Sequence, residues 1–313
     1  MNTLVSICIP AYKQPQLLKK AIESVLMQTY TNYEIIVTDD TPDNSIKEVI
    51  EQFSEPKIKY LKNVSSLGSP ENWNKAISLA SGNYIKLLHH DDHFCVKDAL
   101  QKYVSAFEAD PSLSFVFSYS DIYFKKDNEH FLHEQTNAQL KRIKTETEFL
   151  FFRNCIGSPS AVVFKNDKSI TFNKEYVWLV DVEFYIRYLN IHKTFKCIPE
   201  ALVTIVDGGD EQVTKEVSVN KDLVVKENIN LFSTIYSEKL NTKKALLFFQ
   251  ELFLSFEIDS LETLKRSFVV PVNVDAFMTD VFSDLSKDKI LKKVKKRLLT
   301  SRYNKRFFKI ERF

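Results

Sequence analysis

A run of nine residues, KLLHHDDHF at 86–94, places two adjacent aspartates and three histidines directly after an apolar segment. Adjacent carboxylates are ligands for a hard divalent cation, and such a cation neutralises a bound diphosphate. The histidines, His89, His90 and His93, would also suit a transition metal. A crowded but merely solvated strand end is the alternative to a site of either kind.

A second acidic pair, Asp39 and Asp40, follows another apolar run, YEIIVT at 33–38. Short apolar runs rich in β-branched residues predict buried strands, here and in LVSICIP at 4–10. Amphipathic segments between the runs predict helices, so the first 100 or so residues are expected to form right-handed βαβ units with a parallel sheet. Such sheets bind ligands outside the carboxyl ends of their strands. We therefore expect both acidic pairs to lie along one rim of the sheet.

The chemistry at this rim is not that of a glycine-rich phosphate loop. The sequence contains neither GxGxxG nor GxxxxGK[ST], and it has only five glycines. Dinucleotide-binding and P-loop functions are therefore disfavoured. A metal ion held by carboxylates would neutralise a diphosphate without such a loop.

The domain organisation follows from the change in pattern along the chain. We expect a catalytic domain at 1–215, with a nucleotide-binding half at 1–95 and an acceptor-side half at 96–215. Residues 216–313 are expected to be helical and to end in a basic amphipathic tail. The polar stretch 125–144, which contains His and Lys, predicts a mobile loop.

Composition places the chain among ordinary globular proteins. Hydrophobic residues make up 44% and charged residues 27% of the 313, enough to bury a full-sized core. The four cysteines form no CxxC pair, the first residues lack the pattern of a signal peptide, and no apolar run is long enough to cross a bilayer. We therefore expect reduced thiols and a cytoplasmic location.

Charge is distributed unevenly. Residues 287–313 contain twelve Lys and Arg against two acids, so this tail carries +10 and the rest of the chain −8. Apolar residues fall on one side of the tail's helical pattern and lysines on the other, which suits the anionic inner face of the cell membrane. Packing on the catalytic domain and a disordered basic end are the alternatives. An acidic body without a recognised module argues against nucleic acid as a partner.

Several motifs occur together in an order that resembles a known family. The segments VSICIPAYKQPQLLKKAIESVLMQTYTNYEIIVTDDTPDNS and SLGSPENWNKAISLASGNYIKLLHHDD are similar to the N-terminal half of family 2 inverting glycosyltransferases, bacterial and non-processive in type. The resemblance implies a GT-A fold, an α/β Rossmann-like mixed sheet flanked by helices, here with a helical C-terminal extension. The processive relatives carry Gln-x-x-Arg-Trp and membrane spans, and neither is seen here.

The same resemblance implies roles for the residues of the rim. Asp92 is the expected ligand of Mn²⁺ or Mg²⁺, with Asp91 as a second candidate, and His89 stands where the family often has another Asp. Lys13 also departs from the family, which has Asn there. The residues expected to bind the nucleotide sugar are Pro10, Ala11, Tyr12, Asp39, Asp40, Asn72 and Asp91.

The resemblance further implies a catalytic base on the acceptor side. VDVEFYIR, at 180–187, matches the family's helix-start motif and makes Asp181 the candidate base, with Glu183 as a supporting acid. An acid that merely favours the helix dipole is the alternative for Asp181. Gly157 and Ser158, in IGSPSAVVF, are expected to face the acceptor, or to form an ordinary β-turn.

These features predict an enzyme of hexosyl- or N-acetylhexosaminyl-transferase type in cell-surface polysaccharide synthesis. It would transfer a sugar, with inversion, from a nucleotide-diphosphate donor to a glycan or lipid-linked glycan. A sugar-phosphate nucleotidyltransferase is a second hypothesis, although the turn PAYKQP lacks the glycines that a triphosphate loop would need. A non-catalytic nucleotide-sugar-binding scaffold at the membrane is a third.

Overall fold

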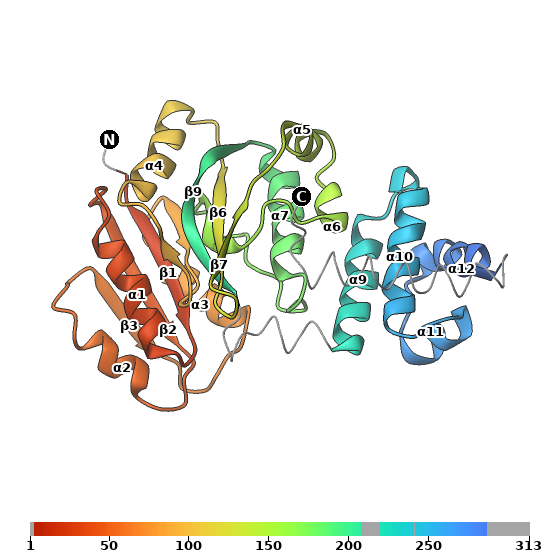
Figure 1. The fold of residues 1–313 in the computed structure, drawn as a ribbon, viewed down its shortest axis with the longest axis horizontal. Coiled ribbons are helices and arrows are strands. Elements are labelled where there is room, and N and C mark those ends of the chain that lie inside the picture. Colours follow the sequence, from red (N-terminus) through yellow and green to blue (C-terminus); the bar gives the residue numbers. More distant parts are fainter. Residues whose placement is uncertain (1–2, 208–219, 241, 287–313) are drawn as a thin grey trace. The chain divides into compact units, whose positions relative to one another are not determined.

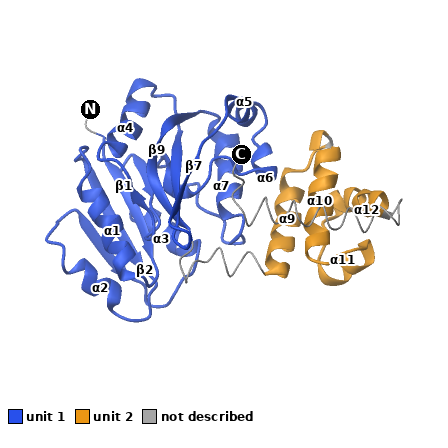
Figure 2. Cartoon of the chain, in the orientation of Figure 1, with its two compact units in different colours: residues 1–210 blue, residues 211–313 orange. Residues whose placement is uncertain are grey.

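The computed structural model describes residues 3–207, 220–240 and 242–286 (Figure 1). The chain divides into two compact units, residues 1–210 and 211–313 (Figure 2). The domain boundary expected near residue 215 falls outside the described residues, and so does the basic tail expected at 287–313.

The first unit is built on a mixed sheet whose strand order is β3-β2-β1-β4-β8-β6-β9-β5, with β7 paired to β6. The strands are β1 (Val5–Ala11), β2 (Tyr33–Asp39), β3 (Ile58–Lys62), β4 (Tyr84–Leu87), β5 (His93–Phe94), β6 (Phe115–Phe124), β7 (Glu129–His133), β8 (Val162–Lys165) and β9 (Phe195–Asp207). β3, β2, β1 and β4 run parallel, whereas β8 is antiparallel to both of its neighbours. This arrangement confirms the expected mixed sheet.

The register of the parallel strands brings their carboxyl ends to one edge. Ala11, the last residue of β1, pairs with Asp39 at the end of β2. Asp39 in turn pairs with Lys62, the last residue of β3. The neighbouring strand β4 ends at Leu87, which pairs with β1 three residues before that strand ends. The acidic pairs that follow β2 and β4 therefore start from the same edge of the sheet.

Helices cover both faces of the sheet (Figure 1). On one face, alternate β1 residues such as Val5 and Ile7 share a core with Leu18 of α1 and Tyr103 of α4. On the other face, Phe164 of β8 lies against Phe184 of α7, with ring centroids 5.1 Å apart. The α-helices are α1 (Pro15–Leu26), α2 (Ser45–Ile50), α3 (Glu71–Ser78), α4 (Ala99–Ala109), α5 (Asn137–Thr145), α6 (Phe149–Phe152) and α7 (Val180–His192), and a 3-10 turn, η1 (Pro159–Ala161), precedes β8.

The prediction of a mobile loop at 125–144 is wrong. β7 forms an antiparallel hairpin with β6, and α5 follows it. α5 begins with a capping box, in which Thr136 accepts a hydrogen bond from the backbone N–H of Gln139 and the Gln139 side chain accepts one from the Thr136 N–H. The strand depends on pairing with β6, a contact that its polar composition does not reveal.

A buried carboxylate holds the opposite edge of the parallel strands. Glu34 of β2 accepts hydrogen bonds from Ser6 at 2.6 Å and from the Ser81 hydroxyl at 2.7 Å, and it pairs with Lys59 at 2.6 Å. Gly82 fits beside this cluster because a Cβ there would lie 2.7 Å from the backbone nitrogen of Ser6. These contacts tie β1, β2 and β3 to the residues that lead into β4.

The described part of the second unit is helical, as expected. Its core is aromatic, with Phe232, Phe249 and Phe277 in mutual ring contact. None of the helices in the described ranges is both long and apolar enough to cross a bilayer. The helices are α9 (Lys221–Ile235), η2 (Glu238–Leu240), α10 (Lys243–Ser255), α11 (Leu261–Ser267) and α12 (Val272–Ser286).

We expect Glu34 to make the stability of the first unit depend on pH. Burial alone would raise the pKa of Glu34, but hydrogen bonds from Lys59, Ser6 and Ser81 lower it to about 2. A carboxyl group with a lowered pKa adds stability above its unfolded value of about 4.3 and loses it as the pH falls toward the folded value. Because 58% of the Lys59 side chain is exposed, solvent screens this ion pair. We expect a contribution of about 1 to 2 kcal/mol at pH 7.

Urea unfolding of Glu34→Gln as a function of pH would measure this contribution. The variant should lose about 1 to 2 kcal/mol at pH 7 and show a flatter decline below about pH 4. Glu23→Gln, which changes an exposed acid of α1, is the matched control and should behave as the wild type. Equal stability of Glu34→Gln and wild type at pH 7 would contradict the assignment.

Candidate active site

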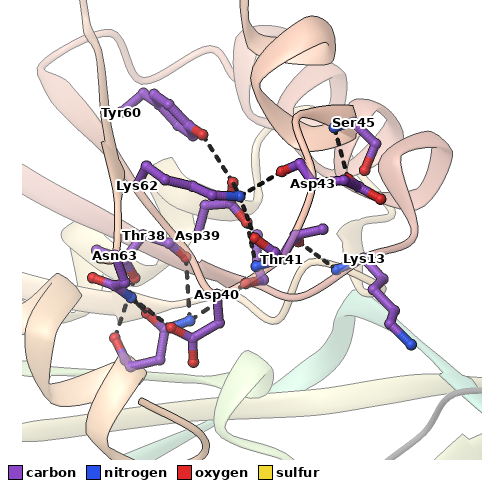
Figure 3. Close-up of polar contacts among 12 residues, drawn as sticks. Lys13, Thr38, Asp39, Asp40, Thr41, Asp43, Ser45, Tyr60, Lys62 and Asn63 are labelled. Atoms are coloured by element: carbon purple, nitrogen blue, oxygen red, sulfur yellow. Dashed lines mark hydrogen bonds and ion pairs between the residues drawn. The ribbon is translucent and has the colours of Figure 1, made fainter. Parts of the chain in front are cut away.

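Asp39 ends β2 with its side chain fully buried. Its Oδ1 accepts a hydrogen bond from the backbone N–H of Thr41 at 2.7 Å, and its Oδ2 accepts from the Tyr60 hydroxyl at 2.8 Å and Lys62 Nζ at 2.9 Å (Figure 3). The Lys62 ammonium also donates to the carbonyl oxygens of Thr41 and Asp43. In the structure, Asp39 therefore shapes the turn that follows β2. Its direct contact with a nucleotide stays a prediction.

Asp40 points to the other side of the strand, toward the segment between β3 and α3 (Figure 3). Its Oδ2 accepts backbone N–H groups of Leu67 at 3.0 Å and Gly68 at 2.8 Å, and its Oδ1 accepts from Asn63 Nδ2 at 2.7 Å. The same Asn63 amide donates to Oδ1 of Asn72 at 2.9 Å. Two of the predicted nucleotide-binding residues, Asp40 and Asn72, thus belong to one buried network.

The end of β1 links this network to the acidic motif after β4. The backbone N–H of Asp40 donates to the Ala11 carbonyl at 2.9 Å, and Nδ1 of His90 lies 3.2 Å from the Pro10 carbonyl oxygen. Tyr12 follows directly and is 40% exposed, so its ring is open to a ligand. The predicted residues Pro10, Ala11 and Tyr12 therefore lie between the ends of β2 and β4.

Lys13 adopts a left-handed backbone conformation, with φ of 54°. Asn enters this region more readily than other non-glycine residues, which gives a physical reason for the Asn that the family has here. In this chain the Lys13 N–H donates to the Thr41 hydroxyl at 2.7 Å, and the ammonium lies 5.1 Å from the centroid of the Tyr12 ring. The substitution therefore places a positive charge beside the predicted nucleotide pocket.

The motif after β4 gathers three metal-binding side chains. One ligand atom each from His89, Asp91 and Asp92 lies within 4.8 Å of the others. Nδ1 of His89 is 3.8 Å from Oδ2 of Asp92, and the imidazole packs on Trp73 with ring centroids 4.7 Å apart. Burial lowers the pKa of His89 to about 4, so the ring is neutral at pH 7 and is able to act as a ligand.

Asp92 is 3% exposed and only partly compensated by hydrogen bonds. Its Oδ1 accepts the backbone N–H of Val206 at 3.1 Å, and the nearby Ser160 side chain also favours the charged carboxylate and so lowers its pKa. Burial and the neighbouring charge of Asp91 nevertheless raise the pKa of Asp92 well above its ordinary value. A cation bound at this carboxylate would reverse both effects.

The donor set fits a divalent metal. Carboxylates suit Mn²⁺ and Mg²⁺, while an imidazole nitrogen favours a transition metal over Mg²⁺, which prefers oxygen ligands. Nε2 of His89 is buried without a hydrogen-bond partner among the described residues, so it is available for coordination. The residues that would hold the metal are His89, Asp91 and Asp92.

Asp181 lies in the first turn of α7 and is held from two sides. Its Oδ1 accepts the backbone N–H of Val182 at 2.8 Å, and its Oδ2 accepts from Asn154 Nδ2 at 2.8 Å. Asn154 also accepts the backbone N–H of Gly157 through its Oδ1 at 3.0 Å. The structure therefore brings the candidate base and the predicted acceptor-side turn together.

The other two acceptor-side predictions differ in their surroundings. Ser158 caps η1 by accepting the backbone N–H of Ser160 at 3.3 Å. Glu183 forms a double hydrogen bond with Arg187, at 2.6 and 3.0 Å, and is 7% exposed. Because Glu183 and Asp181 are two residues apart on a helix, they do not face each other. A supporting catalytic role for Glu183 stays a prediction.

A continuous path of contacts joins the three predicted parts of the site. It runs from the donor-side network at Asp40 through the end of β1 to the motif at 89–92, and from the His89 backbone through Ser160 to the turn that holds Asp181. This path brings residues from the ends of β1, β2, β4 and the start of α7 into one site. The rim expected from strand order thus has a physical basis.

Four residues of this path were not identified from the sequence. Lys86 is a charged residue inside an apolar strand, a signal that could have marked it, and it is fully buried with Nζ donating to the Ser160 carbonyl. Its burial lowers the pKa of Lys86 to about 7, while Asp92 acts in the opposite direction. Asn63, Asn154 and Ser160 carry no comparable sequence signal.

Comparison with known proteins gives these residues a context. The family model described as Glycosyl transferase family 2 matches residues 6–169. An uncharacterized glycosyltransferase of Methanocaldococcus jannaschii is 25% identical over 281 residues, 87% of this chain and 93% of that protein. The Escherichia coli UDP-Glc:alpha-D-GlcNAc-diphosphoundecaprenol beta-1,3-glucosyltransferase WfaP is 34% identical over 124 residues, 40% of this chain and 48% of that protein.

Solved structures share the fold at low sequence identity. The mannosyltransferase PcManGT from Pyrobaculum calidifontis, in complex with GDP-Man and Mn²⁺, matches with a TM-score of 0.56 and 14% identity over 99% of this chain and 88% of that one. S. aureus TarS 1–349 in complex with UDP matches with a TM-score of 0.54 and 14% identity over 96% and 91%. The GT-A fold expected from the sequence is confirmed.

Asp40→Asn should loosen the segment between β3 and α3. The substitution replaces an accepting oxygen with an NH₂ group that faces N–H donors, so we expect a loss of about 1 to 3 kcal/mol in the free energy of unfolding. Binding of UDP or GDP should weaken as well, and a smaller rise in melting temperature on adding nucleotide would report it.

Asp43→Asn is the matched control for this change. The Asp43 carboxylate accepts the backbone N–H of Ser45 at 2.9 Å in an exposed turn and does not touch the Asn63 network. The Asp43→Asn variant should therefore bind nucleotide as the wild type does. If Asp40→Asn and Asp43→Asn behave alike in both measurements, the network does not organise the nucleotide pocket.

Proposed function

The chain belongs to glycosyl transferase family 2, and from this premise we propose that it transfers a single sugar, with inversion, from a nucleotide-diphosphate sugar to a lipid-linked glycan acceptor. The observation that supports this most directly is the path from Asp40 through the motif at 89–92 to Asp181, which would place donor, metal and base at one strand edge. Family membership favours this activity over a nucleotidyltransferase or a non-catalytic scaffold.

The donor would bind along the ends of β1 and β2. Tyr12, which is partly exposed, and Asp40 are the proposed contacts for the nucleobase, with Pro10 and Ala11 between them. The positive charge of Lys13 beside Tyr12 would favour the anionic part of the donor. Asn72, which is buried to nearly the same degree as Asp40, supports this pocket through Asn63.

Asp181 is the proposed general base. The acceptor hydroxyl attacks the anomeric carbon from the face opposite the diphosphate and passes its proton to the Asp181 carboxylate, while the bond to the diphosphate oxygen breaks and that oxygen keeps the electron pair. One oxygen of Asp181 is held by Val182 and the other by Asn154. These two hydrogen bonds fix the orientation in which the carboxylate would accept the proton.

A divalent cation held by His89, Asp91 and Asp92 would neutralise the departing diphosphate. The protein's own part is to keep Asp92 in place through Val206, to hold the His89 backbone through Ser160, and to keep the His89 ring neutral by burial. We propose Mn²⁺ as the preferred ion, because an imidazole completes the donor set.

The acceptor class is proposed by similarity to WfaP, which is named as a glucosyltransferase acting on a diphosphoundecaprenol-linked sugar. An acceptor of this kind lies at the membrane, which agrees with a cytoplasmic enzyme at the inner face of the cell membrane in polysaccharide synthesis. The proposed membrane contact through residues 287–313 concerns residues outside those that the structure describes.

Asp181→Asn should abolish transfer while leaving the donor bound. Loss of the accepting carboxylate removes general-base catalysis, so kcat should fall by roughly 10² to 10⁴ with little change in donor KM. The assay pairs UDP- and GDP-sugars with a synthetic lipid-diphosphate-GlcNAc acceptor in the presence of Mn²⁺.

Glu71→Gln tests the alternative for Asp181. Glu71 is an exposed acid in the first turn of α3, so it shares the favourable helix-dipole position without a place in the site. It should keep wild-type kcat. Near-normal transfer by Asp181→Asn would remove Asp181 from the proposed mechanism.

Chelation should abolish activity, and Mn²⁺ should restore it better than Mg²⁺. His89→Ala should narrow the difference between the two ions, because it removes the nitrogen ligand that Mg²⁺ disfavours. Asp92→Asn should lose Mn²⁺-supported nucleotide binding, measured by calorimetry without turnover. Equal activation by both ions in wild type and His89→Ala would argue against a histidine ligand.

A further inference from the structure

We propose that residues 154–160 form a bracket that sets the spacing between the candidate base and the candidate metal motif at 89–92. One end of the segment, Asn154, binds Asp181, and the other end, Ser160, binds the backbone of His89. The inference rests on the proposed function, since it assigns a positioning role within the same site. Neither Asn154 nor Ser160 is predicted to touch a substrate.

At the base end, a single amide side chain makes three contacts. Nδ2 of Asn154 donates to Asp181 Oδ2 at 2.8 Å and, at 3.4 Å, to the Gly157 carbonyl oxygen. Its Oδ1 accepts the Gly157 N–H at 3.0 Å. Since the turn is closed on the same side chain that holds the carboxylate, a shift of the turn would shift Asp181.

At the metal end, the hydroxyl of Ser160 accepts the backbone N–H of His89 at 2.9 Å. Ser160 is fully buried, so this hydrogen bond is shielded from bulk solvent. The first residue of the metal motif is therefore held against the turn.

The metal end is anchored from beneath by two further donors. Lys86 Nζ donates to the Ser160 carbonyl, and the Tyr103 hydroxyl donates to the Ala161 carbonyl at 2.9 Å. Both side chains are fully buried. Ser160 and the residue that follows the bracket, Ala161, are thus attached to β4 and α4, the strand and helix that flank the metal motif in the sequence.

The middle of the bracket has little freedom to adjust. Gly157 has a φ of 92°, and a Cβ there would lie 3.0 Å from the His133 ring. The Tyr185 hydroxyl donates to the Gly157 carbonyl at 3.1 Å, and Pro159 fixes the first position of η1. Because the segment is restrained at both ends and in the middle, a shift at one end would displace the groups held at the other end.

Inverting transfer requires this kind of restraint. The base and the leaving diphosphate must lie on opposite sides of the anomeric carbon, and a misplacement of about 1 Å costs roughly 10²-fold in rate. The distance from Asp181 to the metal carboxylates therefore matters more than either position alone. Residues 154–160 connect a contact to Asp181 with a contact to the metal motif through seven residues of chain.

The test uses two substitutions. The first keeps the size of the side chain, and the second keeps the backbone carbonyl that binds Lys86. Asn154→Asp keeps the oxygen that accepts the Gly157 N–H but loses the donor to Asp181, and kcat should fall roughly 10 to 100-fold with donor KM and Mn²⁺ affinity unchanged. Ser160→Ala keeps the carbonyl held by Lys86 but loses the hydroxyl. Its half-saturating Mn²⁺ in UDP or GDP binding, measured by calorimetry, should rise roughly 10-fold.

The combination of the two changes distinguishes a bracket from two separate roles. At saturating Mn²⁺ and donor, Ser160→Ala should also lower kcat, and the double variant should lose less than the product of the single losses. If the two substitutions acted independently, their fold-losses in kcat would multiply. If Ser160→Ala does not fold, Ser160→Cys keeps a weak donor and should shift the same two quantities in the same direction.

Controls match each substitution by its chemistry. Asn190→Asp removes an amide that lies 3.5 Å from the Glu148 carboxylate, and Ser114→Ala removes a buried hydroxyl that binds the Thr194 carbonyl. Both should keep wild-type kcat and Mn²⁺ requirement.

A wild-type protein that transfers no sugar would contradict the proposed function. A transferring enzyme whose Asn154→Asp variant keeps its kcat, or whose Ser160→Ala variant keeps its Mn²⁺ requirement, would overturn the bracket and leave the proposed function intact.

Discussion

Burial of carboxylates at the ends of parallel strands is the constraint on which the site depends. An ionised carboxylate away from water is costly unless donors or a cation compensate it. Asp39 is compensated by Lys62, Tyr60 and a backbone N–H, and Asp40 by an amide and two backbone N–H groups. Asp92 has fewer donors and a raised pKa. The chain thus supplies donors for Asp39 and Asp40, which build the proposed pocket, and leaves the charge of Asp92, the proposed metal ligand, to be compensated by a cation.

This division explains the mixed sheet. The parallel strands β3, β2, β1 and β4 supply the rim on which the donor would bind, while the antiparallel β8 brings the turn before it, with Ser160, against the metal motif. α7 then presents Asp181 beside the same turn. In the proposed mechanism, the donor and acceptor sides would meet at this one short segment, and the reaction geometry would depend on how firmly the segment is held.

The position of the two acidic pairs at one edge of the sheet could be predicted from the sequence. Apolar runs that alternate with helical patterns indicate parallel strands, and the carboxyl ends of parallel strands share an edge. The GT-A fold and the family followed from motif order. The partners of the carboxylates were not readable: Asn63, Asn154 and Ser160 act through contacts that arise only after folding. The hairpin strand β7 was missed for the same reason, since its stability comes from β6.

A crystal structure with Mn²⁺, the donor nucleotide and an acceptor analogue tests the central claim most directly. The account requires one ligand cluster, in which the ion contacts Asp92 and at least one of Asp91 and His89, the base lies by Tyr12 and Asp40, and the acceptor hydroxyl is within hydrogen-bond distance of Asp181. An ion or nucleotide bound away from the ends of β1, β2 and β4, or an acceptor that is remote from the start of α7, would contradict it.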